Sequence, residues 1–325
     1  MKIVVVTQNR TNDDRVLKSE HLAKIKKIDS DAQIQEISLE SKNYQKQILT
    51  ADIVIGDASS IQTKSSAPLT KWFHITSAGV NGVSKAILDS DIVITNSSGV
   101  HPIPISEHVF GLMLMLARGL HKAVKVQLDQ KKWVRDVSLY QPGELAGKNL
   151  LVVGMGRIGE RVAILGQAFE MHVTGIVRDP GSHKTKIDLK SVKDLSDELK
   201  NADYVVNCLP STLETVGLFD KNLLSKFKKG SFFINIGRGD TVDEKELIKC
   251  LKSGLIAGAG LDVFEKEPLP DSSPLWEMEN VIVTPHYSGL NPHYFDRVID
   301  IFCTNLNAFL KNKKMPNLVD KKLGY

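Results

Sequence analysis

Residues 150–178 read LLVVGMGRIGERVAILGQAFEMHVTGIVR, and this stretch decides the fold. The apolar run at 149–153 is typical of a strand buried in a parallel sheet. Residues 161–169 are typical of a helix, and residues 172–177 of a second strand. Strand, glycine-rich turn, helix and strand follow one another within about thirty residues, which is the context that a dinucleotide-binding fingerprint requires.

Three glycines lie between the first strand and the helix, with the spacing G-x-G-x-x-G: Gly154, Gly156 and Gly159. The first permits a tight turn, the second lets the backbone approach a pyrophosphate, and the third lets the helix pack closely on the strand. The helix N-terminus then offers N–H groups and the positive end of its dipole to the phosphates. With both strands and the helix around it, the motif predicts a dinucleotide site and not merely a glycine-rich turn.

The end of the second strand bears on the choice of cofactor. An NAD-binding unit usually has an Asp or Glu there, bonded to the adenosine ribose. In this chain the expected acid position is Val177, and Arg178 follows it. Because an arginine can pair with a 2′-phosphate that an acid would repel, we expect NADP(H) to be favoured over NAD(H). The alternative is that Asp179 is the acid, shifted along the loop, and that the cofactor is NAD(H).

The composition is that of an ordinary globular protein. The residues are 42% hydrophobic and 25% charged, as is usual for such a protein, and the length of 325 residues suggests two domains of usual size. The net charge of +4 makes no case for a nucleic-acid partner. Three cysteines lie far apart without metal-site spacing, as expected in a reducing compartment. The N-terminus has no signal-peptide pattern and the apolar run 109–117 is too short to span a bilayer, so we expect a cytoplasmic protein away from membranes.

Strands and helices alternate along the rest of the chain, which predicts parallel, helix-covered sheets. The first hundred residues have no glycine fingerprint and are expected to form a separate α/β unit. Strands are expected at 2–7, 33–37, 51–56, 73–76, 92–95, 204–208, 231–236, 256–262 and 281–284, and helices at 13–28, from 101 onward, and at 194–199, 241–253 and 291–311.

Two loops of the first unit follow expected strands, Ser77–Gly82 and Asn96–Val100. Parallel sheets bind ligands at the carboxyl ends of their strands. Small residues there let backbone N–H groups reach an anion. The loops could equally be ordinary turns, and their own residues leave both interpretations open.

Polar side chains follow three expected strands of the second unit: Arg238, Glu267 and His286. Reducing a 2-keto acid requires a hydride at carbon and a proton at the carbonyl oxygen. His286 can supply the proton, and Glu267 can orient it and stabilise its protonated form. Arg238 offers a planar fork of donors to a carboxylate. Each residue alone could be structural, as a capping arginine, a surface glutamate or a core histidine, but together behind a dinucleotide fold they indicate catalysis.

The chain resembles the D-isomer-specific 2-hydroxyacid dehydrogenase family. The matching segments occur in the family's order over nearly the whole chain: Ser77–Val80, Gly154–Gly159, Asn235–Gly239, Leu261–Pro268 and Thr284–His286. The resemblance implies an α/β fold in which a Rossmann dinucleotide-binding domain, residues 99–287, is inserted in a flavodoxin-like substrate domain, residues 1–98 with 288–325. It also implies a homodimer formed through the nucleotide domain.

The resemblance implies roles for individual residues. It makes Arg238, Glu267 and His286 the catalytic set, and it places Asp262 near the nicotinamide carboxamide. Backbone groups of Ala78, Gly79 and Val80 are expected to bind the substrate carboxylate. The expected cofactor-binding residues are Gly154, Gly156, Arg157, Ile158, Gly159, Val177, Arg178, Asp179, Leu209, Pro210, Ile236, Asp262 and Gly289.

The expected activity is hydride transfer between NAD(P)H and a small 2-keto acid or D-2-hydroxy acid. Ser106-Glu107-His108 resembles the glyoxylate/hydroxypyruvate reductase-like branch more than the phosphoglycerate branch. Tyr287-Ser288-Gly289 follows the histidine at positions where small residues are common in the family, so the resemblance does not define the shape of the pocket. A phosphoglycerate dehydrogenase-like enzyme and a nucleotide-sensing corepressor-like binding protein are the alternatives.

Overall fold

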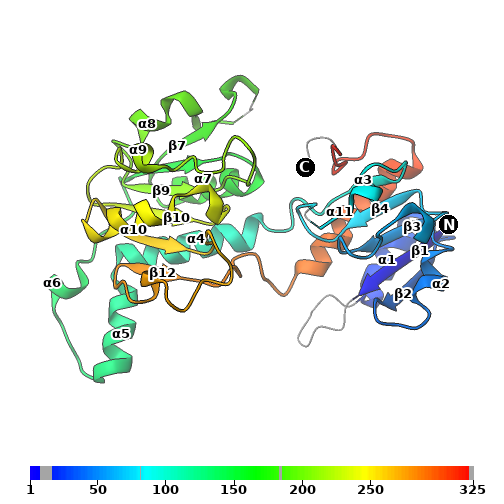
Figure 1. Ribbon diagram of the computed structural model, residues 1–325, viewed down its shortest axis with the longest axis horizontal. Coiled ribbons are helices and arrows are strands. Elements are labelled where there is room, and N and C mark those ends of the chain that lie inside the picture. The colour runs from blue at the N-terminus through cyan, green and yellow to red at the C-terminus, as the bar shows by residue number, and fades with distance from the viewer. Residues whose placement is uncertain (8–16, 81, 183–184, 322–325) are drawn as a thin grey trace. The chain divides into compact units, whose positions relative to one another are not determined.

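The computed structural model describes residues 1–7, 17–80, 82–182 and 185–321. The chain divides into two compact units (Figure 1). Unit 1 comprises Met1–His101 and Leu290–Tyr325, and unit 2 comprises Pro102–Gly289.

Unit 1 is built on a five-stranded parallel sheet with the order β2-β1-β3-β4-β5. This is the strand order of flavodoxin-like folds. The strands are β1 (Lys2–Thr7), β2 (Gln33–Ser38), β3 (Ile53–Gly56), β4 (Trp72–Ile75) and β5 (Val93–Thr95). The apolar runs predicted from the sequence therefore form the buried centre of the sheet.

Helices cover both faces of this sheet. Side chains of α2 (Tyr44–Ile48) and α3 (Lys85–Leu88) belong to the core on one face. Side chains of α1 (Ser19–Ile28) and α11 (Tyr294–Leu310) belong to the core on the other. The C-terminal helix therefore completes the core of unit 1.

Unit 2 has a seven-stranded sheet with the order β12-β11-β10-β9-β6-β7-β8, and every pair is parallel. Chain order reverses between β6 and β9, which is the switch point where doubly wound folds bind dinucleotides. The expected α/β fold with a Rossmann domain is confirmed. The strands are β6 (Asn149–Val153), β7 (His172–Val177), β8 (Asp188–Ser191), β9 (Tyr204–Asn207), β10 (Ser231–Asn235), β11 (Ile256–Leu261) and β12 (Val281–Val283).

The helices of unit 2 form two layers around its sheet. Helices α4 (Pro102–Ala117) and α7 (Arg157–Ala168) share one hydrophobic core. Helices α8 (Leu195–Glu198), α9 (Lys221–Leu224) and α10 (Glu244–Lys252) pack on the opposite face. A Cβ on Gly260 of β11 would lie 2.9 Å from Leu112 Cβ, so α4 rests almost directly on the strand backbone.

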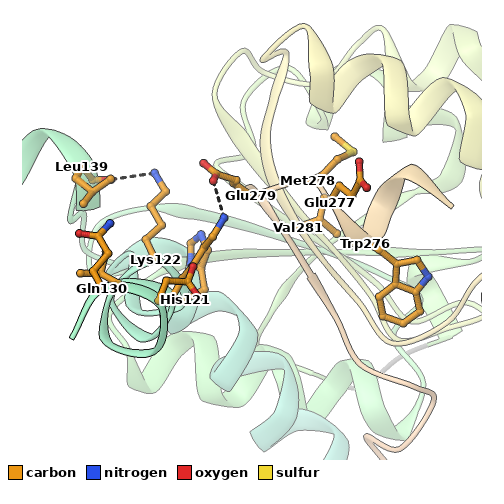
Figure 2. A pocket seen from close by; sticks show the side chains of 12 residues that line it. His121, Lys122, Gln130, Leu139, Trp276, Glu277, Met278, Glu279 and Val281 are labelled. Carbon is orange, nitrogen blue, oxygen red and sulfur yellow. Dashed lines mark hydrogen bonds and ion pairs between the residues drawn. The ribbon is translucent and has the colours of Figure 1, made fainter. Parts of the chain in front are cut away.

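Helices α5 (Leu120–Gln130) and α6 (Val137–Tyr140), with the segment between them, project from the body of unit 2 (Figure 1). We call residues 120–140 the arm. A cavity of about 420 Å³ lies between the arm and residues 276–281 (Figure 2). Lys125 of the arm and Glu279 form an ion pair of 2.7 Å across it. No single described helix is long and apolar enough to cross a membrane, although α4 and α5, bent by 70°, pass that test as a pair.

Several bounds differ from those predicted. Helix α7 begins at Arg157, four residues before the predicted start, because it starts directly after the glycine turn. The sequence analysis had no prediction for β8 or for α5. Part of the helix predicted at 13–28 lies outside the described residues, and α1 begins at Ser19. Single-turn 3₁₀ helices occupy Lys64–Ser66, Pro180–Ser182, Val192–Asp194, Gly239–Thr241 and Pro274–Trp276.

Candidate active site

Three neighbouring strands bring the predicted catalytic residues to one edge of the unit 2 sheet. Arg238 follows β10, Glu267 follows β11 and His286 follows β12. These strands are adjacent and parallel, so their carboxyl ends meet at the same edge. All three residues are exposed there, where a substrate could reach them.

The His286 imidazole and the Glu267 carboxylate form a short contact. His286 Nδ1 lies 2.6 Å from Glu267 Oε2, and the two side chains are 48% and 36% exposed. The other carboxylate oxygen, Oε1, accepts the Phe264 N–H at 3.1 Å. Because a carboxylate only accepts, Nδ1 carries the proton in this contact and Nε2 is left for another partner. Nε2 has no hydrogen-bond partner within the part of the chain that the structure describes.

The backbone at His286 has φ = +49°, in the left-handed region that few non-glycine residues adopt. Three N–H groups tie this segment to Asp262. The His286 N–H donates to Asp262 O at 2.9 Å. The N–H groups of Tyr287 and Ser288 donate to the Asp262 carboxylate at 3.1 and 3.2 Å. A left-handed backbone at a non-glycine residue costs free energy and persists only where contacts such as these three hydrogen bonds fix it. Residues held in this way are frequently found at functional sites.

A chain of side-chain hydrogen bonds extends from Asp262 to α4. Thr284 Oγ1 donates to Asp262 Oδ1 at 2.6 Å and lies 3.0 Å from His108 Nε2. Because the hydroxyl proton goes to the carboxylate, His108 must donate its Nε2–H to Thr284. Burial lowers the pKa of His108, and the Asp262 charge partly opposes that shift. His108 is therefore a neutral hydrogen-bond donor that helps to fix the His286 segment.

Arg238 is placed by close backbone packing. Its Nη1 donates to Gly237 O at 2.8 Å, and among the described residues no carboxylate pairs with it. A Cβ on the next residue, Gly239, would lie 1.9 Å from Phe264 C and O. Only glycine fits there, so the loop that carries Arg238 rests against the loop that leads to Glu267.

Buried asparagines hold the two loops that follow β9 and β10. Asn207 Nδ2 donates to Asn235 Oδ1 at 3.0 Å, and Asn207 Oδ1 accepts the Leu209 N–H at 3.2 Å. The Asn235 amide oxygen also accepts the Gly237 N–H at 3.1 Å. Predicted cofactor-binding residues lie in or beside these loops, namely Leu209, Pro210 and Ile236, while Gly289 lies beyond the His286 segment.

The glycine turn after β6 has the geometry that a dinucleotide requires. Gly154 has φ = +96°, which favours glycine, and it packs against Cys208 and Leu209. A Cβ on Gly159 would lie 2.0 Å from Gly154 O, so the helix could not otherwise approach the turn. A Cβ on Gly156 would meet nothing within 4 Å, which leaves open space beside that backbone. Arg157 and Ile158 begin α7 at this point. These residues fit the predicted cofactor.

The residues at the end of β7 differ in their surroundings. Val177 is buried and faces the core. Arg178 is 73% exposed and its Nη2 donates to Glu214 Oε2 at 2.6 Å. Asp179 Oδ1 accepts the Gly181 N–H at 3.0 Å.

Comparison of the sequence with models of known protein families assigns this chain to one of them. Residues 110–288 match the model of the D-isomer-specific 2-hydroxyacid dehydrogenase NAD-binding domain. The chain belongs to the D-isomer-specific 2-hydroxyacid dehydrogenase family. Family members are oxidoreductases, and the matched domain is the NAD-binding one, which confirms the family and the enzyme class predicted from the sequence.

Individual relatives in the family include reductases and a dehydrogenase. The chain is 34% identical to a glyoxylate reductase of Pyrococcus furiosus over 71% of its own length and 70% of that protein. It is 34% identical to a D-3-phosphoglycerate dehydrogenase of Archaeoglobus fulgidus over 78% of its own length and 47% of that protein. The solved structure of an NADPH-dependent glyoxylate/hydroxypyruvate reductase of Sinorhizobium meliloti, in complex with NADP and sulfate, is 26% identical, with a TM-score of 0.79 and full coverage of both chains.

The predicted substrate-binding residues Ala78, Gly79 and Val80 lie in unit 1, after β4. Gly79 is exposed, whereas Val80 is buried. The Ser97 N–H donates to Ser77 O at 2.9 Å, so the loops after β4 and β5 are joined. Substrate binding by this loop stays a prediction.

Sequence reasoning missed two contributors to the site. Thr284 and His108 belong to the motifs Thr284–His286 and Ser106-Glu107-His108. A contact between residues 176 positions apart, however, cannot be recognised in a single sequence. The Glu214 partner of Arg178 also had no signal, because it depends on how the loop after β9 folds.

Proposed function

We propose that this protein reduces small 2-keto acids to D-2-hydroxy acids with NAD(P)H. The observation that carries the proposal is the 2.6 Å contact between His286 Nδ1 and Glu267 Oε2, at the same sheet edge as Arg238. At one sheet edge, an oriented imidazole can protonate a carbonyl oxygen and an arginine can bind a carboxylate. The similarity to glyoxylate reductases supports this class of substrate.

The chain's own residues account for the proton and for orientation. A bound nicotinamide would supply the hydride that reaches the keto carbon. His286 donates the Nε2 proton to the carbonyl oxygen and keeps its Nδ1–H on Glu267. Glu267 orients the ring and stabilises its charged form. Arg238 binds the substrate carboxylate, and we also assign this role to the backbone N–H groups of Gly79 and Val80.

Gly154, Gly156 and Gly159, with the first residues of α7, would hold the pyrophosphate of the dinucleotide. We propose that NADPH is favoured over NADH, because the exposed Arg178 guanidinium can bind a 2′-phosphate. The Asp179 carboxylate already accepts an N–H in its own turn, which makes it a less available ribose partner.

The test is oxidation of NADPH and NADH, side by side, with glyoxylate, hydroxypyruvate, pyruvate and a branched 2-keto acid. We expect turnover with at least one acid and faster turnover with NADPH. Preference for NADH would contradict the role of Arg178 in cofactor choice. Turnover only with a phosphorylated substrate would favour the phosphoglycerate dehydrogenase alternative. Nucleotide binding without turnover of any acid would favour a binding protein.

We also propose that the protein is a cytoplasmic homodimer joined through the arm. Large hydrophobic side chains are exposed on this element, including Leu128 at 68%, Trp133 at 96% and Val137 at 71%. A projecting element with this much exposed apolar surface is typical of an interface. The three cysteines are free, which fits a reducing compartment.

A further inference from the structure

The Arg178–Glu214 ion pair joins the two loops on either side of the glycine turn. Strand β6, which leads into Gly154, lies between β7 and β9 in the sheet. Arg178 follows β7, and Glu214 lies in the loop after β9. The Nη2–Oε2 contact of 2.6 Å therefore connects the carboxyl ends of the two strands that flank the proposed nucleotide site.

Local hydrogen bonds hold Glu214 in this place. The Thr215 and Val216 N–H groups donate to Thr212 O at 3.0 and 2.9 Å, and Thr215 Oγ1 lies within hydrogen-bond distance of Pro210 O. At the start of the same loop, Leu209 packs against Gly154. The glutamate therefore stands on a turn that is fixed relative to the glycine motif, while its side chain is 68% exposed.

We propose that Glu214 is a specificity-determining residue that competes with the 2′-phosphate of NADPH for the Arg178 guanidinium. This inference rests on the proposed function. Arginine is the side chain that favours the phosphorylated dinucleotide, and its terminal Nη2 donor already binds a carboxylate. A bound 2′-phosphate must displace that carboxylate or share the guanidinium with it, close to a second negative charge. Glu214 thus weakens the preference for NADPH that Arg178 creates.

The size of the effect follows from the exposure of the pair. Ion pairs between exposed side chains are weak, so removing the competitor should tighten NADP⁺ binding by about two- to fivefold. Binding of NAD⁺, which lacks the 2′-phosphate, should stay the same. The change should be greatest in low salt, because exposed charges are screened as ionic strength rises.

The experiment is isothermal titration of NADP⁺ and NAD⁺ into the full-length protein and its variants, in low salt. Glu214→Gln removes the charge and keeps the shape. Asp197→Asn is the matched control, because Asp197 also forms an exposed ion pair, with Lys200 at 2.7 Å. Asp197 precedes β9, so it lies near the amino end of that strand, whereas Glu214 follows the carboxyl end. We expect Glu214→Gln to lower the dissociation constant of NADP⁺ alone, and Asp197→Asn to change neither constant.

A third variant tests whether the effect passes through Arg178. In an Arg178→Gln background, Glu214→Gln should tighten NADP⁺ binding less than it does when Arg178 is present, because only direct repulsion between the carboxylate and the 2′-phosphate is removed. An equal gain in both backgrounds would overturn the inference. So would a Glu214→Gln variant that binds NADP⁺ no more tightly than the unsubstituted protein. If the unsubstituted protein bound neither dinucleotide, the proposed function itself would fail, so the two failures are distinguishable.

Discussion

His286 Nδ1 lies 2.6 Å from Glu267 Oε2, although the histidine backbone is in the left-handed region with φ = +49°. Three N–H donations to Asp262, two of them to its carboxylate, hold the backbone in that conformation. The carboxylate of Glu267 then fixes the ring. Backbone and ring are thus held by different acidic residues, and both follow β11.

His286→Ala should lower kcat for keto-acid reduction by about 10²- to 10⁴-fold, because the proton donor is lost. Cofactor affinity should change little, since the glycine turn is untouched. Steady-state kinetics, with NADP⁺ titration as the binding readout, measure both. His172→Ala is the matched control. His172 is an exposed histidine of unit 2 at the amino end of β7, whereas His286 follows the carboxyl end of β12. Turnover of His286→Ala at a rate near that of the unsubstituted protein would show that the acid–base assignment is wrong.

Thr284→Val should lower the free energy of unfolding by about 1–3 kcal/mol, because the partly buried His108 donor and a buried Asp262 oxygen each lose a partner. It should also lower kcat, since the segment from Thr284 to His286 would be less firmly held. Urea denaturation and steady-state kinetics measure the two effects. Thr284→Ser keeps the hydroxyl and should restore most of both. Equal behaviour of the valine and serine variants would mean that the hydroxyl is not the important group.

The sequence predicted most of the strands, and the position of Arg238, Glu267 and His286 after strands, because both depend on local patterns. The glycine spacing at Gly154–Gly159 and the polar residues after strands can be read residue by residue. The network from His108 to Asp262 could not be predicted, because it depends on where α4 crosses the sheet. The arm was missed for a different reason. Leu120, Val124 and Leu128 recur every four residues, which is a helical pattern that the sequence analysis did not use, but a single sequence does not show that this face is exposed.

Gly156→Ala should fold normally but bind NADP⁺ and NAD⁺ at least tenfold more weakly, because its Cβ would occupy the space that the pyrophosphate needs. Gly159→Ala should instead destabilise the fold, since its Cβ would lie 2.0 Å from Gly154 O. Thermal unfolding and titration calorimetry separate the two effects. Gly111→Ala, in α4 with nothing near the added Cβ, is the control and should be neutral or slightly stabilising. Normal dinucleotide binding by Gly156→Ala would place the pyrophosphate elsewhere.

His74 should make unit 1 sensitive to mild acid. Its ring is fully buried and lies 2.7 Å from Thr95 Oγ1 and 3.1 Å from Ser97 Oγ. Burial lowers the pKa of His74 to about 3, whereas an unfolded histidine titrates near pH ~6.5. The stabilisation by neutral His74 is therefore complete above pH ~6.5 and is lost as the pH falls toward 3, by up to about 1.4 kcal/mol per pH unit.

The measurement is urea denaturation between pH 7 and pH 4, for the unsubstituted protein and His74→Gln. Glutamine cannot take up a proton in this range, so the stability of the variant should depend less on pH. Asp296 has a pKa lowered to about 2, chiefly by its hydrogen bond with His21. Its contribution to stability is therefore lost mainly below pH ~4, outside the range of this measurement. Parallel pH profiles for the two proteins would show that His74 does not limit acid stability.

Leu128→Glu should convert a dimer into a monomer. Leu120, Val124 and Leu128 recur every four residues along α5, so they share a helix face, and they are 46%, 48% and 68% exposed. A charge on that face would have to be buried in the interface, which is costly. Light scattering after size exclusion should give twice the 35.9 kDa chain mass for the unsubstituted protein and the single mass for the variant. Leu69→Glu, at a 57% exposed leucine of unit 1, should remain dimeric. A monomeric unsubstituted protein would rule out the dimer, and a dimeric Leu128→Glu would place the interface away from the arm.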